Sequence, residues 1–344
     1  MTNNRIITFD GIRGIAVLMV MLLHAHFQLG KGGAIGVDIF FVLSGFLITQ
    51  NLLDDYVSNG NISMKKFWLK RFFRLFPPFF VLLISIFILS FYIEDVKLKN
   101  AVLIEIRDSF LYLSNFSWFW SDHNDNRILG HTWSLSVEQQ FYIVWPLFLY
   151  GIIRFVQKKW VFVMLLIVFL SLSFFKHSRY SSEIFKSIYF ESIFIGCMFS
   201  IAVWNRWITN YRHSFLAFLS FVLICVVGLF GFDFFKYFSL TGYVFLLVPL
   251  AVILILINCM SLDNSWINNI LSFKPLVYIG SISYGLYLWH IPVFRLFKWY
   301  SNSPPYISFI LKFILTFIIA SLSYFLLEKK MLMISRNIMN KLYK

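Results

Sequence analysis

The chain has 344 residues, of which 59% are apolar and only 13% are charged. Soluble domains carry roughly 25% charged residues, so this composition excludes an ordinary soluble enzyme and indicates a polytopic membrane protein. Lys and Arg number 30 against 16 Asp and Glu, a net charge of +14. In a membrane chain this excess indicates basic loops at an anionic leaflet, and the sequence shows no nucleic-acid-binding module. The cysteines lie within apolar runs, so we expect neither a disulfide framework nor a metal site.

About ten segments are apolar over a length that can cross a hydrocarbon core of about 30 Å as helices. They cover residues 8–28, 34–53, 72–93, 134–153, 160–175, 187–204, 214–232, 237–260, 276–297 and 306–327. With the N-terminus inside, more Lys and Arg fall on the cytoplasmic side than outside, as the positive-inside rule requires. The sequence therefore predicts an all-α, polytopic transmembrane helix bundle of about ten spanning helices with both termini cytoplasmic. The longest loop, residues 94–133, is predicted to lie outside.

One domain accounts for these spans, because the sequence has no repeat of fixed period and no second soluble domain. We assign residues 1–330 to this transmembrane domain and residues 331–344 to a basic amphipathic cytoplasmic tail. In the tail, Ile334, Ile338 and Leu342 are four residues apart among Lys and Arg, the spacing of a basic helix that lies on the inner leaflet. We expect the tail to act as an anchor only.

Ionisable side chains inside the spans are the candidates for function, because each costs a few kcal/mol in a membrane and needs a partner, a water-filled cavity or a chemical role. In the first span Arg13 and His24 are eleven residues apart. They therefore share one helix face and are separated by roughly 16 Å along the axis. This arrangement suits a substrate whose anionic part is held by Arg13 and whose reacting atom lies near His24. The alternative is a snorkelling arginine and a histidine bonded to a neighbouring helix.

The second span begins near Asp38, which follows Gly36. An Asp at this place predicts an N-cap at the helix start, and a role toward a substrate is the alternative. Further along, Gly45 predicts close packing of this helix against the first one.

The third span opens with three cations, Lys70, Arg71 and Arg74. Arg71 and Arg74 are three residues apart, so they occupy neighbouring positions on one face, which suits phosphate or carboxylate oxygens. The following Pro77–Pro78 predicts a kink or a restart of the helix, with backbone groups that line a cavity. A positive-inside anchor is the alternative role for the two arginines.

The fourth span opens with a polar stripe. His131, Ser134 and Glu138 follow an i, i+3, i+7 pattern, so they lie on one helix face that points away from lipid. Glu138 could pair with Arg13 or hold His24 in the tautomer that a general base requires. A buried structural ion pair is the alternative.

Five motifs in this order closely resemble the acyltransferase-3 family of integral membrane acyltransferases, over essentially the whole chain. They are Phe9–Ala16 with His24, Gly36–Ile48, Lys70–Pro77, His131–Glu138 and Ser283–His290. The resemblance implies transfer of an acyl group, usually acetyl from cytoplasmic acetyl-CoA, to a hydroxyl of a cell-surface or exported carbohydrate such as O-antigen, capsule or exopolysaccharide. It also implies a location in the plasma membrane, the inner membrane of a bacterium.

The resemblance implies roles for the residues already selected by their cost in a membrane. We expect His24 to act as general base, Glu138 to orient it, and Arg13 to steady the donor charge or the developing oxyanion; these are the predicted catalytic residues. The predicted residues for binding the acyl-CoA phosphates are Arg71, Arg74 and Lys70. The predicted substrate-binding residues are Trp133, Ser134, Asp38 and His290.

The expected partners are acyl-CoA, a lipid-linked or surface glycan as acceptor, and membrane lipid. Some relatives in the family carry an esterase-like C-terminal domain, and this sequence ends shortly after its last span. We therefore expect it either to deliver the acyl group itself or to pass it, as a donor subunit, to a separate esterase-fold partner. A lipid-linked glycan carrier or flippase is the rival from another class, because transport pathways also contain buried Arg, Glu and His. Direct transfer and a transient acyl-His24 remain alternatives.

Overall fold

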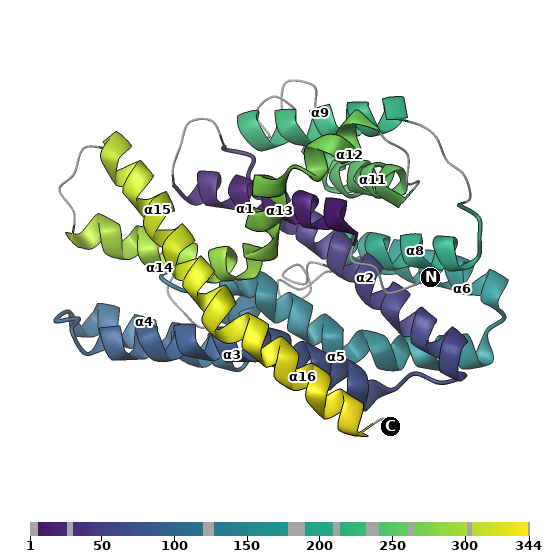
Figure 1. Ribbon diagram of the computed structural model, residues 1–344, viewed down its shortest axis with the longest axis horizontal. Helices are drawn as coiled ribbons and strands as arrows, with labels where there is room; N and C mark the ends of the chain where they lie inside the picture. Colours follow the sequence, from purple (N-terminus) through teal and green to yellow (C-terminus); the bar gives the residue numbers. More distant parts are fainter. Residues whose placement is uncertain are drawn as a thin grey trace. The chain divides into compact units, whose positions relative to one another are not determined.

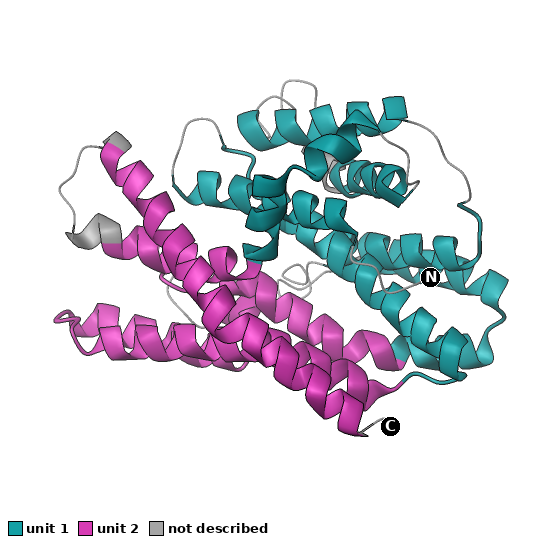
Figure 2. Cartoon of the chain, in the orientation of Figure 1, with its two compact units in different colours: residues 1–62, 148–181, 189–283 teal, residues 63–147, 182–188, 284–344 magenta. Residues whose placement is uncertain are grey.

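The structure is a computed structural model that describes residues 6–25, 30–119, 127–177, 190–208, 214–231, 241–260, 265–300 and 305–342. Within these ranges the regular elements are helices and no strand occurs (Figure 1), which confirms the all-α prediction. The chain divides into two compact units (Figure 2), which are described separately below. Unit 1 comprises residues 1–62, 148–181 and 189–283, and unit 2 comprises residues 63–147, 182–188 and 284–344.

The helices of unit 1 other than α6 share one apolar core, and α6 packs on α8. In chain order they are α1 (Ile7–His24), α2 (Ile35–Asn59), α6 (Lys158–His177), α8 (Glu191–Trp204), α9 (Ser214–Phe230), α11 (Thr241–Met260), α12 (Trp266–Leu271) and α13 (Lys274–Ser281). Helix α2 packs against α1, α8, α9 and α11, and its side chains Val42 and Leu43 are at most 1% exposed. The short helices α12 and α13 pack on α1. The helices that carry Arg13, His24 and Asp38 are thus the ones around which the unit is packed.

Glycines allow close approach between helices of unit 1. Gly45 of α2 and Gly196 of α8 each lie against the backbone of the facing helix, which leaves no room for a side chain at either position. Gly36 of α2 makes the corresponding contact with Ala16 of α1. The prediction that Gly45 faces the first helix is therefore wrong. Nine residues separate Gly36 from Gly45, and nine steps of 100° place them on opposite sides of the helix.

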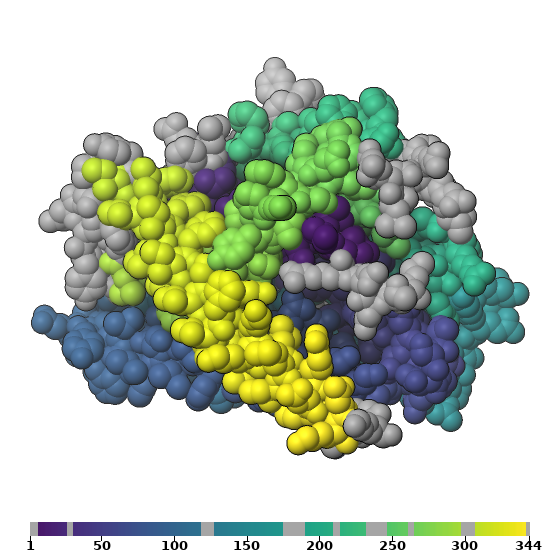
Figure 3. Space-filling model, viewed as in Figure 1, coloured from purple at the N-terminus to yellow at the C-terminus, as the bar shows by residue number. Residues whose placement is uncertain are grey.

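Unit 2 combines long helices with short segments between them. Its elements are α3 (Met64–Ser90), α4 (Val96–Phe110), η1 (Ser114–Phe119), α5 (Thr132–Phe155), α14 (Ser283–Tyr300), α15 (Pro305–Ser323), η2 (Tyr324–Glu328) and α16 (Lys329–Leu342). The last turns of α5 belong to unit 1, and α14 begins at the last residue of that unit. Helix α3 packs against α4, η2 and α16. The last three elements form one continuous helix, whose yellow α16 lies at the surface in Figure 3 with Leu332 and Met333 exposed.

Several described helices are suited to a membrane. Four are long and apolar enough to cross one: Ile7–His24, Ile35–Asn59, Met64–Ser90 and Ile307–Lys341. Shorter apolar helices lie at Glu191–Trp204, Ser214–Phe230 and Leu246–Met260. These helices agree with the membrane character expected from composition. The number of about ten spans and the cytoplasmic position of both termini stay predictions.

Helix α3 runs through Pro77–Pro78 without ending, so the predicted restart is wrong. Apolar sequence with good helical tendency continues on both sides, and the Tyr284 hydroxyl donates a hydrogen bond to the carbonyl oxygen of Leu75 at 2.7 Å. The two prolines still have no N–H, so the carbonyl oxygens of Phe73 and Arg74 lack their usual intrahelical donors.

Asp38 does not cap α2. The helix begins at Ile35, its N-cap Ala34 makes no side-chain hydrogen bond, and Asp38 lies within the first turn. The helix begins close to the predicted span boundary at residue 34 and before Asp38, because residues 30–35 already form turns, with the N–H of Ile35 bonded to the carbonyl of Gly32 at 3.1 Å.

Two further boundaries differ from those predicted. The loop 94–133 contains α4 and η1, and Asp95 caps α4 by accepting the N–H groups of Lys97 and Leu98 at 2.8 and 3.2 Å. The predicted ninth span, residues 276–297, is interrupted at Ile282, between α13 and α14.

Candidate functional site

Arg13 lies on α1 and pairs with Asp10, one turn earlier. Its Nη1 donates a hydrogen bond to Oδ1 of Asp10 at 2.9 Å, and Asp10 is only 3% exposed. Gly280 of α13 packs directly on the backbone of Asp10. A buried carboxylate without its cation is strongly destabilising, so Asp10 and Arg13 fix each other's position. Sequence reasoning missed Asp10, although its spacing of three from Arg13 was visible.

His24 is the last residue of α1, and the helix backbone sets its ring orientation. Its Nδ1 lies 2.9 Å from the carbonyl oxygen of Val20. A carbonyl oxygen only accepts, so Nδ1 carries the proton of the neutral ring and Nε2 keeps the lone pair. The side chain is half-buried. A neutral imidazole with an unprotonated Nε2 is the form in which histidine acts as a base.

Asp38, the third predicted residue of unit 1, joins two helices. Its Oδ1 accepts a hydrogen bond from the hydroxyl of Ser192 at 2.6 Å, which ties α2 to α8. This contact is structural, and its assignment to substrate binding stays a prediction.

Arg71 of α3 is held by aromatic rings in unit 2. Its guanidinium carbon lies 5.3 Å from the ring centre of Tyr142 and 5.8 Å from that of Phe67. The charges of Arg74 and Glu138 also act on it. An aromatic ring packs on the flat face of a guanidinium and fixes its orientation. The N–H groups at the edge of the guanidinium keep their planar geometry, which matches the oxygens of a phosphate.

Arg74 follows one turn later on the same helix and is half-buried. No hydrogen bond or ion pair joins its side chain to another described residue. Lys70, on the preceding turn, is exposed. The first half of α3 therefore contains five cations, Lys65, Lys66, Lys70, Arg71 and Arg74, and their combined field attracts an anionic ligand.

A cluster of buried polar side chains joins the start of α5 to α14. Ser134 Oγ lies 2.5 Å from the Tyr287 hydroxyl, which donates to the carbonyl oxygen of His131 at 3.0 Å. The rings of His131 and His290 lie 5.1 Å apart, and His290 is fully buried. Ser134 and His290 thus position the two helices. Their assignment to substrate binding stays a prediction, as does that of the half-buried Trp133 on α5.

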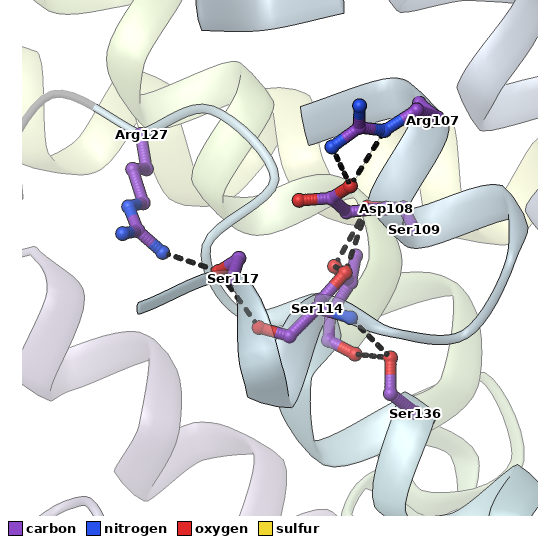
Figure 4. A network of polar contacts seen from close by, with 8 residues as sticks. Arg107, Asp108, Ser109, Ser114, Ser117, Arg127 and Ser136 are labelled. Atoms are coloured by element: carbon purple, nitrogen blue, oxygen red, sulfur yellow. Dashed lines mark hydrogen bonds and ion pairs between the residues drawn. The ribbon is translucent and has the colours of Figure 1, made fainter. Parts of the chain in front are cut away.

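A second polar network ties α4 and η1 to the start of α5 (Figure 4). The hydroxyl of Ser109 lies 2.8 Å from that of Thr132, which also bonds to Ser114 at 2.9 Å. The N–H of Ser114 donates to Ser136 at 3.2 Å. Flanking contacts join Arg127 to Ser117 at 2.8 Å and Arg107 to Asp108 at 2.8 Å. The beginning of α5 is therefore fixed by hydroxyl groups from three elements.

Glu105 of α4 holds the segment that leads into α5. Its Oε2 accepts the backbone N–H of Leu129 at 2.6 Å. Burial raises the pKa of this carboxyl from its ordinary value near 4.5 to about 7, although the backbone hydrogen bonds and the charges of Arg127 and Arg295 lower it. Sequence reasoning missed Glu105 because it considered ionisable groups within the spans only.

The predicted site residues fall into two groups. Unit 1 holds Arg13, His24 and Asp38, and unit 2 holds Lys70, Arg71, Arg74, Trp133, Ser134, Glu138 and His290. Within unit 2 the side chains of Arg71 and Glu138 are brought into electrostatic interaction. The pairing of Glu138 with Arg13 or His24 stays a prediction. Among the described residues, no three His, Cys, Asp or Glu side chains form a group that could hold a metal ion.

Comparison with known proteins identifies the family to which these sites belong. An acyltransferase domain matches residues 6–326, a range that contains every predicted site residue. The chain belongs to the acyltransferase-3 family. This confirms the resemblance that the five sequence motifs indicated. No solved structure matches the acyltransferase chain.

Relatives of this acyltransferase-3 chain carry names of O-acetyltransferases. It is 32% identical over 357 residues to the putative peptidoglycan O-acetyltransferase YrhL of Bacillus subtilis, covering 93% of this chain and 54% of the relative. It is 32% identical over 351 residues to the peptidoglycan O-acetyltransferase OatA of Listeria monocytogenes, covering 93% and 55%. A putative O-acetyltransferase of Staphylococcus aureus is 30% identical over 352 residues, covering 93% and 56%. The chain thus spans about half the length of these relatives.

Proposed function

We propose that this acyltransferase-3 chain is a membrane-embedded O-acetyltransferase of the plasma membrane, which moves acetyl from cytoplasmic acetyl-CoA to a hydroxyl of a cell-envelope glycan. The observation that carries the proposal is the acyltransferase domain over residues 6–326, together with the buried ionisable groups inside it. The names of the relatives favour peptidoglycan as the acceptor over the O-antigen, capsule or exopolysaccharide expected from the sequence.

The donor is bound by the cations of α3. Arg71 and Arg74 take the phosphates of CoA, and the exposed Lys70 strengthens the local positive field. The aromatic contacts of Arg71 with Tyr142 and Phe67 support this role, because they orient the guanidinium before a ligand arrives.

His24 accepts and then returns the proton during acyl transfer. Its Nε2 accepts the proton of the acceptor hydroxyl as the oxygen forms a bond to the thioester carbonyl carbon. Arg13, held by Asp10, stabilises the negative charge that develops on the carbonyl oxygen. When the tetrahedral intermediate collapses, the carbon–sulfur bond breaks and the CoA sulfur takes the proton back from His24. The hydrogen bond from Nδ1 to Val20 supports this assignment, because it leaves Nε2 as the basic atom.

Inside-out membrane vesicles test the proposal. Acetyl-labelled acetyl-CoA is added outside, where the cytoplasmic face is exposed, and label is followed into lumenal glycan. We expect transfer by the wild type and a loss of about 100-fold or more for His24→Ala. The matched control is His26→Ala, at a second histidine two residues further along the sequence, and we expect this variant to retain activity.

Each other outcome contradicts a part of the proposal. If label never leaves CoA when native glycan is present, the donor assignment is wrong and a glycan carrier becomes the function to test. If transfer appears only after an esterase-fold protein is added, the chain is a donor subunit. If His24→Ala is as active as His26→Ala, His24 is not the base.

A further inference from the structure

The end of the last long helix contains a π-helical turn, η2, at residues Tyr324–Glu328. Such turns are rare in helices and occur frequently at functional sites. Glu328, at the end of the turn, is an ionisable residue in the candidate span Ile307–Lys341 and is only 5% exposed. Nothing in the mechanism above uses this carboxylate.

Two polar atoms of this turn are buried without a partner. Oε1 of Glu328 and Oγ of Ser323 have no hydrogen bond to any described residue. Residues five apart follow one another along one side of a π turn, so both groups lie on the same side. Leaving a buried polar atom unbonded is costly, and for a charged group the cost is larger. A protein keeps a buried polar group of this kind where a bound ligand supplies the missing hydrogen bond.

The element that η2 packs against carries the complementary charge. Helix η2 lies on α3, and the charge of Arg74 acts on Glu328. The two side chains nevertheless form no ion pair, since no salt bridge is found at either residue in the described part of the chain. In a poorly solvated site a free carboxylate and a free guanidinium attract each other strongly. Their separation leaves both groups available to a ligand.

The backbone of α3 adds acceptors at the same place. Pro77 and Pro78 supply no N–H, so the carbonyl oxygens of Phe73 and Arg74 lose their helical donors. The surroundings of Arg74 therefore include the unpaired Oε1 of Glu328 and two backbone carbonyl oxygens that lack their usual helical donors. A ligand that fits must carry an anionic group and, next to it, N–H or O–H donors.

We infer that Glu328 is a further donor-binding residue, whose carboxylate accepts a hydrogen bond from an N–H or O–H group of acyl-CoA while Arg74 holds a neighbouring phosphate. This inference rests on the proposed function, because it assigns the ligand of Arg74 as acyl-CoA. CoA has suitable donors on both sides of its diphosphate, namely the hydroxyl and amides of the pantetheine arm and the amino group of adenine. Glu328 thus distinguishes CoA from a simple anion, which Arg74 alone would bind.

The test compares donor kinetics in the vesicle assay for Glu328→Ala, Glu328→Gln and the wild type. Glu328→Ala removes the acceptor, and we expect KM for acetyl-CoA to rise about tenfold or more while kcat changes little. Glu328→Gln keeps a carbonyl acceptor and restores most of the affinity. Glu94→Ala removes an exposed carboxylate from the same unit and should match the wild type. Thermal unfolding of each variant reports on the fold, and Glu328→Ala should unfold no earlier than the wild type, because it removes an unsatisfied buried group.

A second acyl donor, which lacks the nucleotide of CoA, shows which part of CoA bonds to Glu328. If the effect of Glu328→Ala persists with S-acetyl-phosphopantetheine, the group lies in the pantetheine arm; if it disappears, the group lies in the nucleotide. Both results support the inference. It is overturned if Glu328→Ala leaves KM unchanged while Arg74→Ala raises it, or if Glu328→Ala lowers only thermal stability. If the wild type does not use acetyl-CoA at all, both the proposed function and the role of Glu328 are wrong. If the wild type uses acetyl-CoA and only the Glu328→Ala result disagrees, the role of Glu328 alone is wrong.

Discussion

Glu105→Gln should remove a pH dependence from the stability of unit 2. In the folded chain the pKa of Glu105 is raised from 4.5 to about 7 by burial. Between these values the folded state keeps a proton that the unfolded chain releases, so stability is highest at low pH and falls as the pH rises through 7. For a fully buried carboxyl the fall between pH 5 and 8 would be about 2.5 kcal/mol. Solvent at this partly exposed side chain reduces it to about 1–1.5 kcal/mol.

Thermal unfolding in detergent at a series of pH values measures this effect. A change of that size corresponds to about 3–5 °C in Tm for a unit of this length. The glutamine carbonyl can still accept the N–H of Leu129, so wild type and Glu105→Gln should unfold together at pH 5, and the variant should unfold later at pH 8. Because other groups titrate in this interval, the quantity to examine is the difference between the two proteins. Glu94→Gln, at an exposed carboxylate, should leave the slope unchanged.

If the difference in Tm between wild type and Glu105→Gln does not change from pH 5 to 8, the reasoning is refuted. It would mean that water reaches the carboxylate and that α4 does not pack over the segment leading into α5. A difference of opposite sign would mean that the cations Arg127 and Arg295 outweigh burial.

Three further changes probe the site and its scaffold. Arg71→Lys keeps the charge but loses the planar fork and much of the contact with Tyr142, so KM for acetyl-CoA should rise about tenfold with kcat nearly constant, as steady-state kinetics would show. Asp10→Ala leaves Arg13 without its carboxylate and should lower the unfolding free energy by about 3 kcal/mol, whereas an unchanged Tm would contradict the buried pair. Gly280→Ala forces a methyl group onto the backbone of Asp10 and should cost about 1–3 kcal/mol or more, visible as reduced folded yield in size-exclusion chromatography.

The positions of the long helices could be predicted because each apolar run is long and continuous. Helix α4 was missed because its residues are mixed in polarity, although Asp95, which caps it, marked its start. The α13–α14 break had a local signal that the prediction missed, because Gly280 and Ser281 directly precede Ile282 and Ser283 follows it. Such small residues interrupt some helices and are tolerated within others, and packing against other helices decides between the two outcomes.

The candidate site was predictable where a single residue is costly in a membrane. Arg13, His24 and Arg74 are visible for that reason alone. Their partners were less visible. Asp10 lies three residues from Arg13, but the contact between Ser134 and Tyr287 joins residues 153 apart and depends on the register of two helices. How two distant helices align along their length cannot be derived from a single sequence. The π turn at Glu328 was equally hidden, because its residues read as an ordinary apolar helix.

The π turn also determines how two parts of one helix face their surroundings. It contains one residue more than an α-helical turn, and each residue rotates the side chain by about 100°. The wide turn takes up this extra residue, so the basic helix α16 keeps the phase that a regular helix one residue shorter would give it. Removing a single residue between 324 and 328 would therefore restore a regular helix and leave the side of α16 that packs on α3 unchanged. A deletion elsewhere in α15 or α16 has no such turn to absorb it and would rotate the following side chains by about 100°. Over evolution this stretch should accept the loss of one residue more readily than the regular helices on either side of it.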